Sequence, residues 1–262
     1  MFPHKSASAA NSGISASSDC LDDAIAKNDP GFAAAALDSL TNASDPVRSR
    51  NVPEAALRRA CRAVGRAMRQ FRGVPSIQIR AASYVRAFLG NSWGNARANF
   101  VFECPVISEL LLAGSATDDA GVASSVTGSL KDICVQACPA LSGAARAIMH
   151  CDGVVLLDRA MRRHARSKTV ASNCIFVLQC AYSTGEHCLA FRATAGCFPS
   201  TLRGVLRAHG DPLLAGYILE LLIACGGPGS SNAALRACAS LAREAGASAG
   251  LAWSAVRAML RE

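Results

Sequence analysis

The chain has 262 residues, with 27 Lys and Arg against 19 Asp and Glu, which gives a net charge of +8. Hydrophobic residues make up 51% but aromatic residues only 5%, so alanine supplies much of the apolar fraction. Alanine has the highest helix propensity and allows helices to approach closely. Because alternating runs of β-branched residues are nearly absent, the composition excludes a sheet-based fold and predicts an all-α one.

Residues 1–18 are rich in Ser and Ala and carry no helical apolar stripe, so we expect a disordered tail. The segment lacks the apolar core of a secretory signal, and its sole fixed side-chain cation is Lys5, which disfavours the alternative of an organelle transit peptide. The most apolar windows, 170–182 and 213–225, are shorter than the roughly 20 residues of a membrane span. We therefore expect one soluble helical-repeat domain over residues 19–262, in the cytoplasm or nucleus.

Proline, glycine and aspartate divide the rest of the chain into helical segments. Asp211-Pro212, for example, supplies an N-cap followed by proline at the first helical position, and Asp118-Asp119 cap another helix. In chain order, the expected helices are 21–27, 32–40, 54–71, 77–88, 105–112, 122–133, 139–149, 154–164, 170–182, 186–194, 199–209, 212–225, 232–244 and 248–260.

Four of these segments carry apolar residues on one template, i, i+4, i+7, i+8 and i+11, which is the stripe that one helix face presents to a core. The first positions are 45, 48 and 44 residues apart, close to the period of armadillo and HEAT units. Only Ser129 interrupts the apolar pattern. The stripes are Ile77, Ala81, Tyr84, Val85, Phe88; Val122, Val126, Ser129, Leu130, Ile133; Val170, Cys174, Val177, Leu178, Ala181; and Leu214, Ile218, Leu221, Leu222, Cys225.

The last two units are also similar to each other in the helix that precedes the stripe. Met161-Arg162-Arg163-His164 and Leu206-Arg207-Ala208-His209 each begin four residues after a leucine. Here the chain resembles the armadillo-repeat family, over about residues 53–260 and best over 139–227. The resemblance implies a right-handed α-solenoid of about four to five armadillo- or HEAT-like repeats, whose third helices line a concave groove.

The family places asparagine three residues, and a large residue six residues, after the start of the stripe, both facing the groove. Asn173 matches the first of these positions, where the other units have Arg80, Ser125 and Tyr217. The resemblance therefore implies partner contacts by Arg80, Asn173, Phe176, Tyr217 and Glu220. The family's second asparagine is replaced in every unit, so we expect a ligand other than a nuclear-localisation peptide.

Arginine forms two clusters on predicted helices. Arg58, Arg62, Arg66 and Arg69 are spaced by three or four residues and so share a helix face, and Arg162 and Arg163 belong to the second cluster. Such patches suit an acidic partner, or the phosphates of RNA or DNA. A solvated basic face explains the same spacing, because arginine is frequent throughout the chain and few aromatic residues accompany the clusters.

The twelve cysteines contain no C-x-x-C pair, and His150-Cys151 and His187-Cys188 lie a whole repeat apart, so we predict no metal site. Neither a phosphate-binding glycine loop nor a nucleophile elbow occurs, so we predict no enzymatic activity and no cofactor. The leading hypothesis is a scaffold that binds a segment of a partner protein, and the alternative is a basic nucleic-acid-binding repeat protein. Homodimerisation through Leu251, Trp253, Val256 and Leu260 is a further expectation.

Overall fold

The computed structural model describes residues 5–44, 52–89, 101, 105–136, 141–183, 198–209, 211, 214–218 and 221. Within these ranges the chain is helical and forms no β-strand, which confirms the all-α prediction. The helices are α1 (Lys5–Ala26), α2 (Pro30–Ala43), α3 (Glu54–Gln70), α4 (Pro75–Leu89), α6 (Val106–Ala116), α7 (Ala120–Gln136), α8 (Leu141–His150), α9 (Gly153–Arg163), α10 (Lys168–Ser183) and α12 (Phe198–His209).

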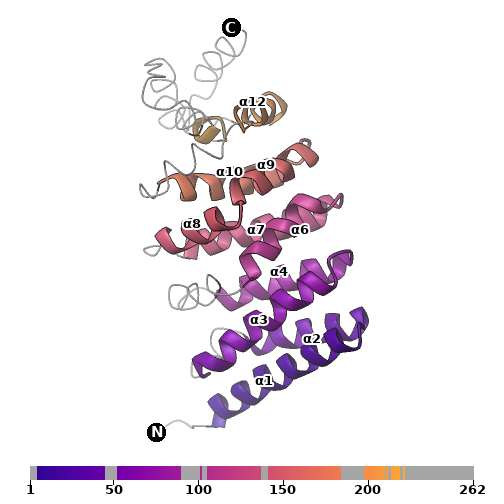
Figure 1. Cartoon of the computed structure of the whole chain (residues 1–262). Helices are drawn as coiled ribbons and strands as arrows, with labels where there is room; N and C mark the ends of the chain where they lie inside the picture. The colour runs from indigo at the N-terminus through magenta and orange to yellow at the C-terminus, as the bar shows by residue number, and fades with distance from the viewer. Residues whose placement is uncertain are drawn as a thin grey trace.

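Most of these helices belong to two rows, stacked in chain order from α1 towards α12 (Figure 1). The first row is α1, α3, α6, α9 and α12, and each helix contacts the next helix of the row. The second row is α2, α4, α7 and α10, again with each helix against the next. One helix from each row forms a layer, as in the pairs α3 with α4 and α6 with α7. Helix α8 packs mainly against α10 and stands outside this two-row pattern.

The apolar stripes predicted from the sequence lie in the core. The complete stripes of α4, α7 and α10 are buried, as are Leu214, Ile218 and Leu221 of the fourth. Ser129 is buried with them, and its hydroxyl donates to the Ala82 carbonyl oxygen of the neighbouring helix at 2.9 Å. The interruption in the pattern is therefore a satisfied polar contact between α7 and α4.

Helix α2 carries a further copy of the stripe, which the sequence pattern did not reveal. The buried positions are Ala33, Leu37 and Leu40 of the helix and Ser44 at its C-cap, and Ala33 lies 44 residues before Ile77. Small and polar residues at this end of the chain weaken the hydrophobic periodicity on which the prediction depends.

The expected disordered tail is wrong for residues 5–18, which belong to α1. The isolated Ile14 is fully buried, and the Ser18 hydroxyl donates to its carbonyl oxygen at 2.8 Å. The Ser/Ala composition hid this helix, because small residues bury against α2 and α3 without producing a hydrophobic stripe.

Helix boundaries follow the predicted capping chemistry. The Asp29 carboxylate accepts from Phe32 N at 2.9 Å before Pro30 opens α2, and Asp119 accepts from Gly121 N at 2.7 Å at the start of α7. Asp211 accepts from Leu214 N at 3.0 Å, as expected for the next boundary. The expected helices 186–194, 232–244 and 248–260, and the dimer contact at Leu251, Trp253, Val256 and Leu260, lie outside the described residues.

Buried apolar side chains from Ile14 to Leu221 form one continuous cluster that runs through both rows. Among the helices that the structure describes, none has the length and apolar character needed to cross a bilayer.

Candidate functional site

Polar contacts between layers recur at equivalent repeat positions in the first row. Arg69 Nε donates to Glu109 Oε1 at 2.8 Å, and Arg162 Nε donates to Thr201 Oγ1 at 2.9 Å. Both arginines follow a buried methionine near the end of their helix, and both partners precede a buried leucine of the next first-row helix. A repeat position that looks basic in the sequence is therefore used to hold consecutive layers together.

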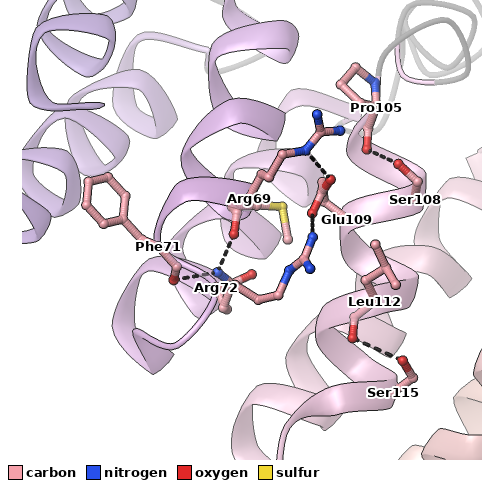
Figure 2. Close-up of polar contacts among 10 residues, drawn as sticks. Arg69, Phe71, Arg72, Pro105, Ser108, Glu109, Leu112 and Ser115 are labelled. Carbon is pink, nitrogen blue, oxygen red and sulfur yellow. Dashed lines mark hydrogen bonds and ion pairs between the residues drawn. The ribbon is translucent and has the colours of Figure 1, made fainter. Parts of the chain in front are cut away.

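Glu109 is the most enclosed carboxylate of this network, with a side chain only 2% exposed. Figure 2 shows it between Arg69 and Arg72, which reach it from the end of α3 and the turn that follows. The second contact, from Arg72 Nη2 to Glu109 Oε2, measures 2.9 Å. A buried carboxylate is stable only when it is paired and hydrogen-bonded, and two arginines meet that need here. An acidic residue inside the apolar run of α6 is the one sequence signal for this site, and helical spacing alone does not reveal its partners.

The remaining arginines of the first predicted cluster are also largely occupied. Arg58 pairs with Glu54 one turn earlier at 2.6 Å, and Arg66 pairs with Asp22 of α1 at 2.5 Å. Arg62 is exposed and has no polar partner within the described part of the chain. Most of the positive charge that the sequence places on this helix face is thus matched by acidic residues of the neighbouring helices.

The second cluster follows the same plan. Arg162 also pairs with Asp158 at 2.5 Å, and Arg163 donates to the Ala116 carbonyl oxygen at 2.6 Å and to Asp118 at 2.9 Å. Arg159 and Arg166 are exposed and lack a polar partner among the residues that the structure describes.

His164 and His209 make matching contacts with the preceding layer. His164 Nε2 lies 3.0 Å from the Thr117 carbonyl oxygen, and His209 Nε2 lies 3.0 Å from the Ala165 carbonyl oxygen. Since a carbonyl oxygen only accepts, the ring nitrogen donates in both contacts. The two histidines, which the sequence aligns, fill the space between consecutive turns at the ends of first-row helices.

Two predicted partner-binding residues contact the preceding helix of the second row. Arg80 Nε lies 3.0 Å from each carboxylate oxygen of Asp38 on α2. Asn173 is only 8% exposed, and its amide nitrogen donates to Thr127 Oγ1 at 3.3 Å and to the Ser124 carbonyl oxygen at 3.5 Å. The asparagine position thus contributes to stacking, which leaves it little surface for a ligand.

The other predicted partner-binding residues differ in accessibility. Phe176 and Tyr217 are partly buried and pack against the core cluster. The ammonium group of Lys131, on α7, lies 5.6 Å from the Phe176 ring centroid, within the range of a cation–π contact. Glu220 lies outside the described residues.

The outward surface of the second row carries small side chains beside the Arg86–Asp132 ion pair. Ser83 is exposed and Gly128 and Phe176 are partly exposed at the same register of α4, α7 and α10, six residues after the start of each stripe. Ile79 on α4 is 38% exposed and Val135 on α7 is 48% exposed. We call the surface formed by Ile79, Ser83, Gly128, Lys131, Val135 and Phe176 the second-row face.

Two cysteines connect α7 and α10 beside this face. Cys134 of α7 and Cys180 of α10 share a hydrogen bond between their thiols. This bond and the burial of Cys134 raise the pKa of Cys134. The same bond lowers the pKa of Cys180. Over the described ranges, no three His, Cys, Asp or Glu side chains gather closely enough to hold a metal ion.

Comparison with known proteins found no match to a family model, a curated protein or a solved structure.

Proposed function

We propose that the chain is an α-solenoid of armadillo or HEAT type, whose second-row face binds an extended segment of a partner protein. The two-row stacking supports this proposal, because equivalent helices recur along the stack and extend one surface over several layers. The three-helix unit α8, α9 and α10 resembles an armadillo repeat, and the two-helix layers before it resemble HEAT repeats.

The observation that carries the proposal is the set of exposed apolar side chains on the second row. Arginines pair across layers in both rows, as Arg69 does with Glu109 and Arg80 does with Asp38. The second-row face adds exposed Ile79 and Val135 and the partly exposed Phe176 to these pairs. Exposed apolar side chains suit the side chains of a polypeptide better than a sugar-phosphate backbone.

Lys131 gives the face its preference for an acidic partner segment. It stands over Phe176 and has no carboxylate partner within the described residues, whereas Arg86 pairs with Asp132 at 2.7 Å. An acidic residue of the partner next to an apolar one would contact Lys131 and Phe176 together.

Nucleic-acid binding is the second candidate, and Arg62, Arg159 and Arg166 favour it. These arginines are exposed and unpaired within the described residues, on or directly after first-row helices. They come from two layers that are separated by the α6 layer, and α6 itself contains no arginine. Three dispersed cations supply few of the phosphate contacts from which sequence-independent affinity arises.

The experiment compares protein capture by the wild-type chain with capture by two charge-matched variants. Lys131→Glu with Phe176→Ser alters the second-row face, and Arg62→Ser with Arg159→Ser alters the exposed first-row arginines; each pair lowers the net charge by two. Extracts are treated with nuclease or left untreated, and the eluates are analysed for protein and nucleic acid.

We expect the face variant to capture at least tenfold less protein than wild type. Nuclease should not change the amount of captured protein, and the first-row variant should capture as much as wild type. Far-UV circular dichroism should be unchanged in both variants. Nuclease-sensitive capture that fails only in the first-row variant would reject the scaffold proposal in favour of nucleic-acid binding.

A further inference from the structure

Two cysteines meet at the interface between α7 and α10. Cys134 of α7 is buried and Cys180 of α10 is half-buried, and their thiols share a hydrogen bond. Neither residue belongs to a disulfide. The interface therefore holds two thiols in direct contact, one on each of two consecutive second-row helices.

The packing of α7 against α10 independently places these two residues opposite each other. Asn173 Nδ2 of α10 donates to Thr127 Oγ1 of α7 at 3.3 Å, and these residues are 46 positions apart in the chain. Cys134 and Cys180 are also 46 positions apart, and each lies seven residues, about two helical turns, beyond Thr127 or Asn173. Because residues seven apart share a helix face, the line of contact that includes Thr127 and Asn173 continues to the cysteine pair.

The cysteine pair is not a requirement of the repeat. Counted from the first stripe residue of each helix, the corresponding positions at the α4–α7 interface are Leu89 and Asp132. Leu89 is buried, and Asp132 pairs with Arg86 at 2.7 Å. Stacking of second-row helices is thus achieved without sulfur one layer earlier, so packing alone does not explain two cysteines at this place.

The two thiols differ in accessibility and in ionisation. The hydrogen bond from Cys134 lowers the pKa of Cys180, whereas the same bond and burial raise the pKa of Cys134. The thiolate is the form of cysteine that attacks an oxidant, and Cys180 is also the more exposed of the two. Cys180 is therefore the thiol that an oxidant meets first, and Cys134 stands behind it as the second sulfur.

We propose that Cys134 and Cys180 form a reversible oxidation site, at which hydrogen peroxide converts the two thiols to a disulfide that joins α7 to α10. The Cys180 sulfur attacks the peroxide, so that an S–O bond forms, the O–O bond breaks and the first water leaves. The Cys134 sulfur then attacks the Cys180 sulfur, so that the S–S bond forms, the S–O bond breaks and the second water leaves with the Cys134 proton. The two thiols together lose two electrons and two protons, and the peroxide is reduced to two molecules of water.

The position of the pair in the helices suits this reaction. A disulfide needs the sulfurs to move from hydrogen-bond contact to about 2.05 Å. Cys134 lies in the last turn of α7 and Cys180 in the last turn of α10, where a helix adjusts at low cost in free energy. The bond would lie next to Val135 and one turn from Phe176, beside the second-row face, but it does not depend on the function proposed for that face.

The test treats the reduced full chain with hydrogen peroxide under native conditions and maps the products by mass spectrometry. After the remaining thiols are blocked, trypsin releases Cys134 in peptide 132–146 and Cys180 in peptide 169–192, and fragmentation of the linked peptides assigns the bond. Parallel samples contain dimedone, which traps sulfenic acids. The variants are Cys180→Ser, Cys134→Ala and, as a control that removes an exposed thiol, Cys20→Ser. Thermal melting of every variant checks the fold.

We expect wild type and Cys20→Ser to form a disulfide between Cys134 and Cys180, which a dithiol reductant reverses. In Cys134→Ala, Cys180 should stop at the sulfenic acid and give about tenfold more dimedone adduct than in wild type. In Cys180→Ser, Cys134 should remain a thiol that is alkylated only after unfolding.

Absence of the Cys134–Cys180 bond in oxidised wild type overturns the proposal. Oxidation of Cys134 in Cys180→Ser at the wild-type rate also overturns it, because Cys134 would then not depend on Cys180. If Cys134→Ala fails to fold, the products of wild type and the state of Cys134 in Cys180→Ser still decide the question.

Discussion

Replacement of Glu109 by glutamine tests whether the arginine clusters hold the layers together. The substitution keeps the shape of a side chain that is 2% exposed but removes the charge that binds Arg69 and Arg72. Hydrogen bonds to charged groups contribute about 1.5–3 kcal/mol each, and breaking a buried ion pair costs about 3–5 kcal/mol. The two arginines are 62% and 46% exposed, so water rehydrates them after the change. We therefore expect a loss of about 2 kcal/mol, below the fully buried limit.

Thermal unfolding followed by circular dichroism measures this effect. A loss of about 2 kcal/mol corresponds to a fall in Tm of about 4–8 °C for a chain of this size. The control is Glu54→Gln, because Glu54 is 59% exposed and pairs with Arg58 one helical turn away. That change should cost less than about 0.5 kcal/mol. Equal Tm values for the two variants would show that burial of Glu109 adds nothing to the stability that its ion pairs provide.

Two glycine substitutions and one thiol measurement test other parts of the stack. Gly153→Ala should destabilise by about 2–3 kcal/mol in urea unfolding, because a Cβ there would lie 2.5 Å from the Ile148 carbonyl oxygen. Gly128→Ala should stabilise the chain by about 0.5–1 kcal/mol in the same assay, because alanine favours a helix and its Cβ would lie no closer than 3.5 Å to the Asn173 amide nitrogen. A loss of stability would contradict this expectation. Burial raises the pKa of Cys174, so at pH 8 iodoacetamide should label exposed Cys20 and spare Cys174 until the chain unfolds, as followed by mass spectrometry. In the unfolded chain Cys174 ionises at its usual pKa of 9.0, whereas the buried thiol keeps its proton to a higher pH. Loss of the proton therefore favours the unfolded chain, and the free energy of unfolding should fall as the pH rises above 9.0.

The sequence predicted the parts of the fold that depend on strong local patterns. Buried stripes such as Ile77 to Phe88 combine large apolar residues with helical spacing, and capping residues such as Asp119 and Asp211 precede predicted helices. These signals are local, so they can be read without knowing which helices meet. Residues 5–18 lacked such a pattern, because serine and alanine do not distinguish a closely packed helix from a loose tail.

The site could be predicted only in outline, because its contacts join residues from different layers. Spacing placed Arg69 and Arg162 on helix faces, but their partners Glu109 and Thr201 lie 40 and 39 residues further along the chain. Resemblance to the armadillo family implied a ligand contact for Asn173, whereas its amide bonds to α7. A helical stripe indicates which residues are buried but not which polar side chains are used between neighbouring repeats.

Photocrosslinking from the second-row face tests the proposed scaffold function most directly. A photoreactive phenylalanine analogue replaces Ser83 at the centre of the face in one protein and Arg62 on the first row in another. After irradiation in native extract, mass spectrometry identifies the attached molecules. We expect the analogue at position 83 to capture protein segments that contain acidic and apolar residues, whether or not nuclease is present, and the analogue at position 62 to capture none. Equal protein capture from both positions, or capture of nucleic acid from Arg62 alone, would contradict it.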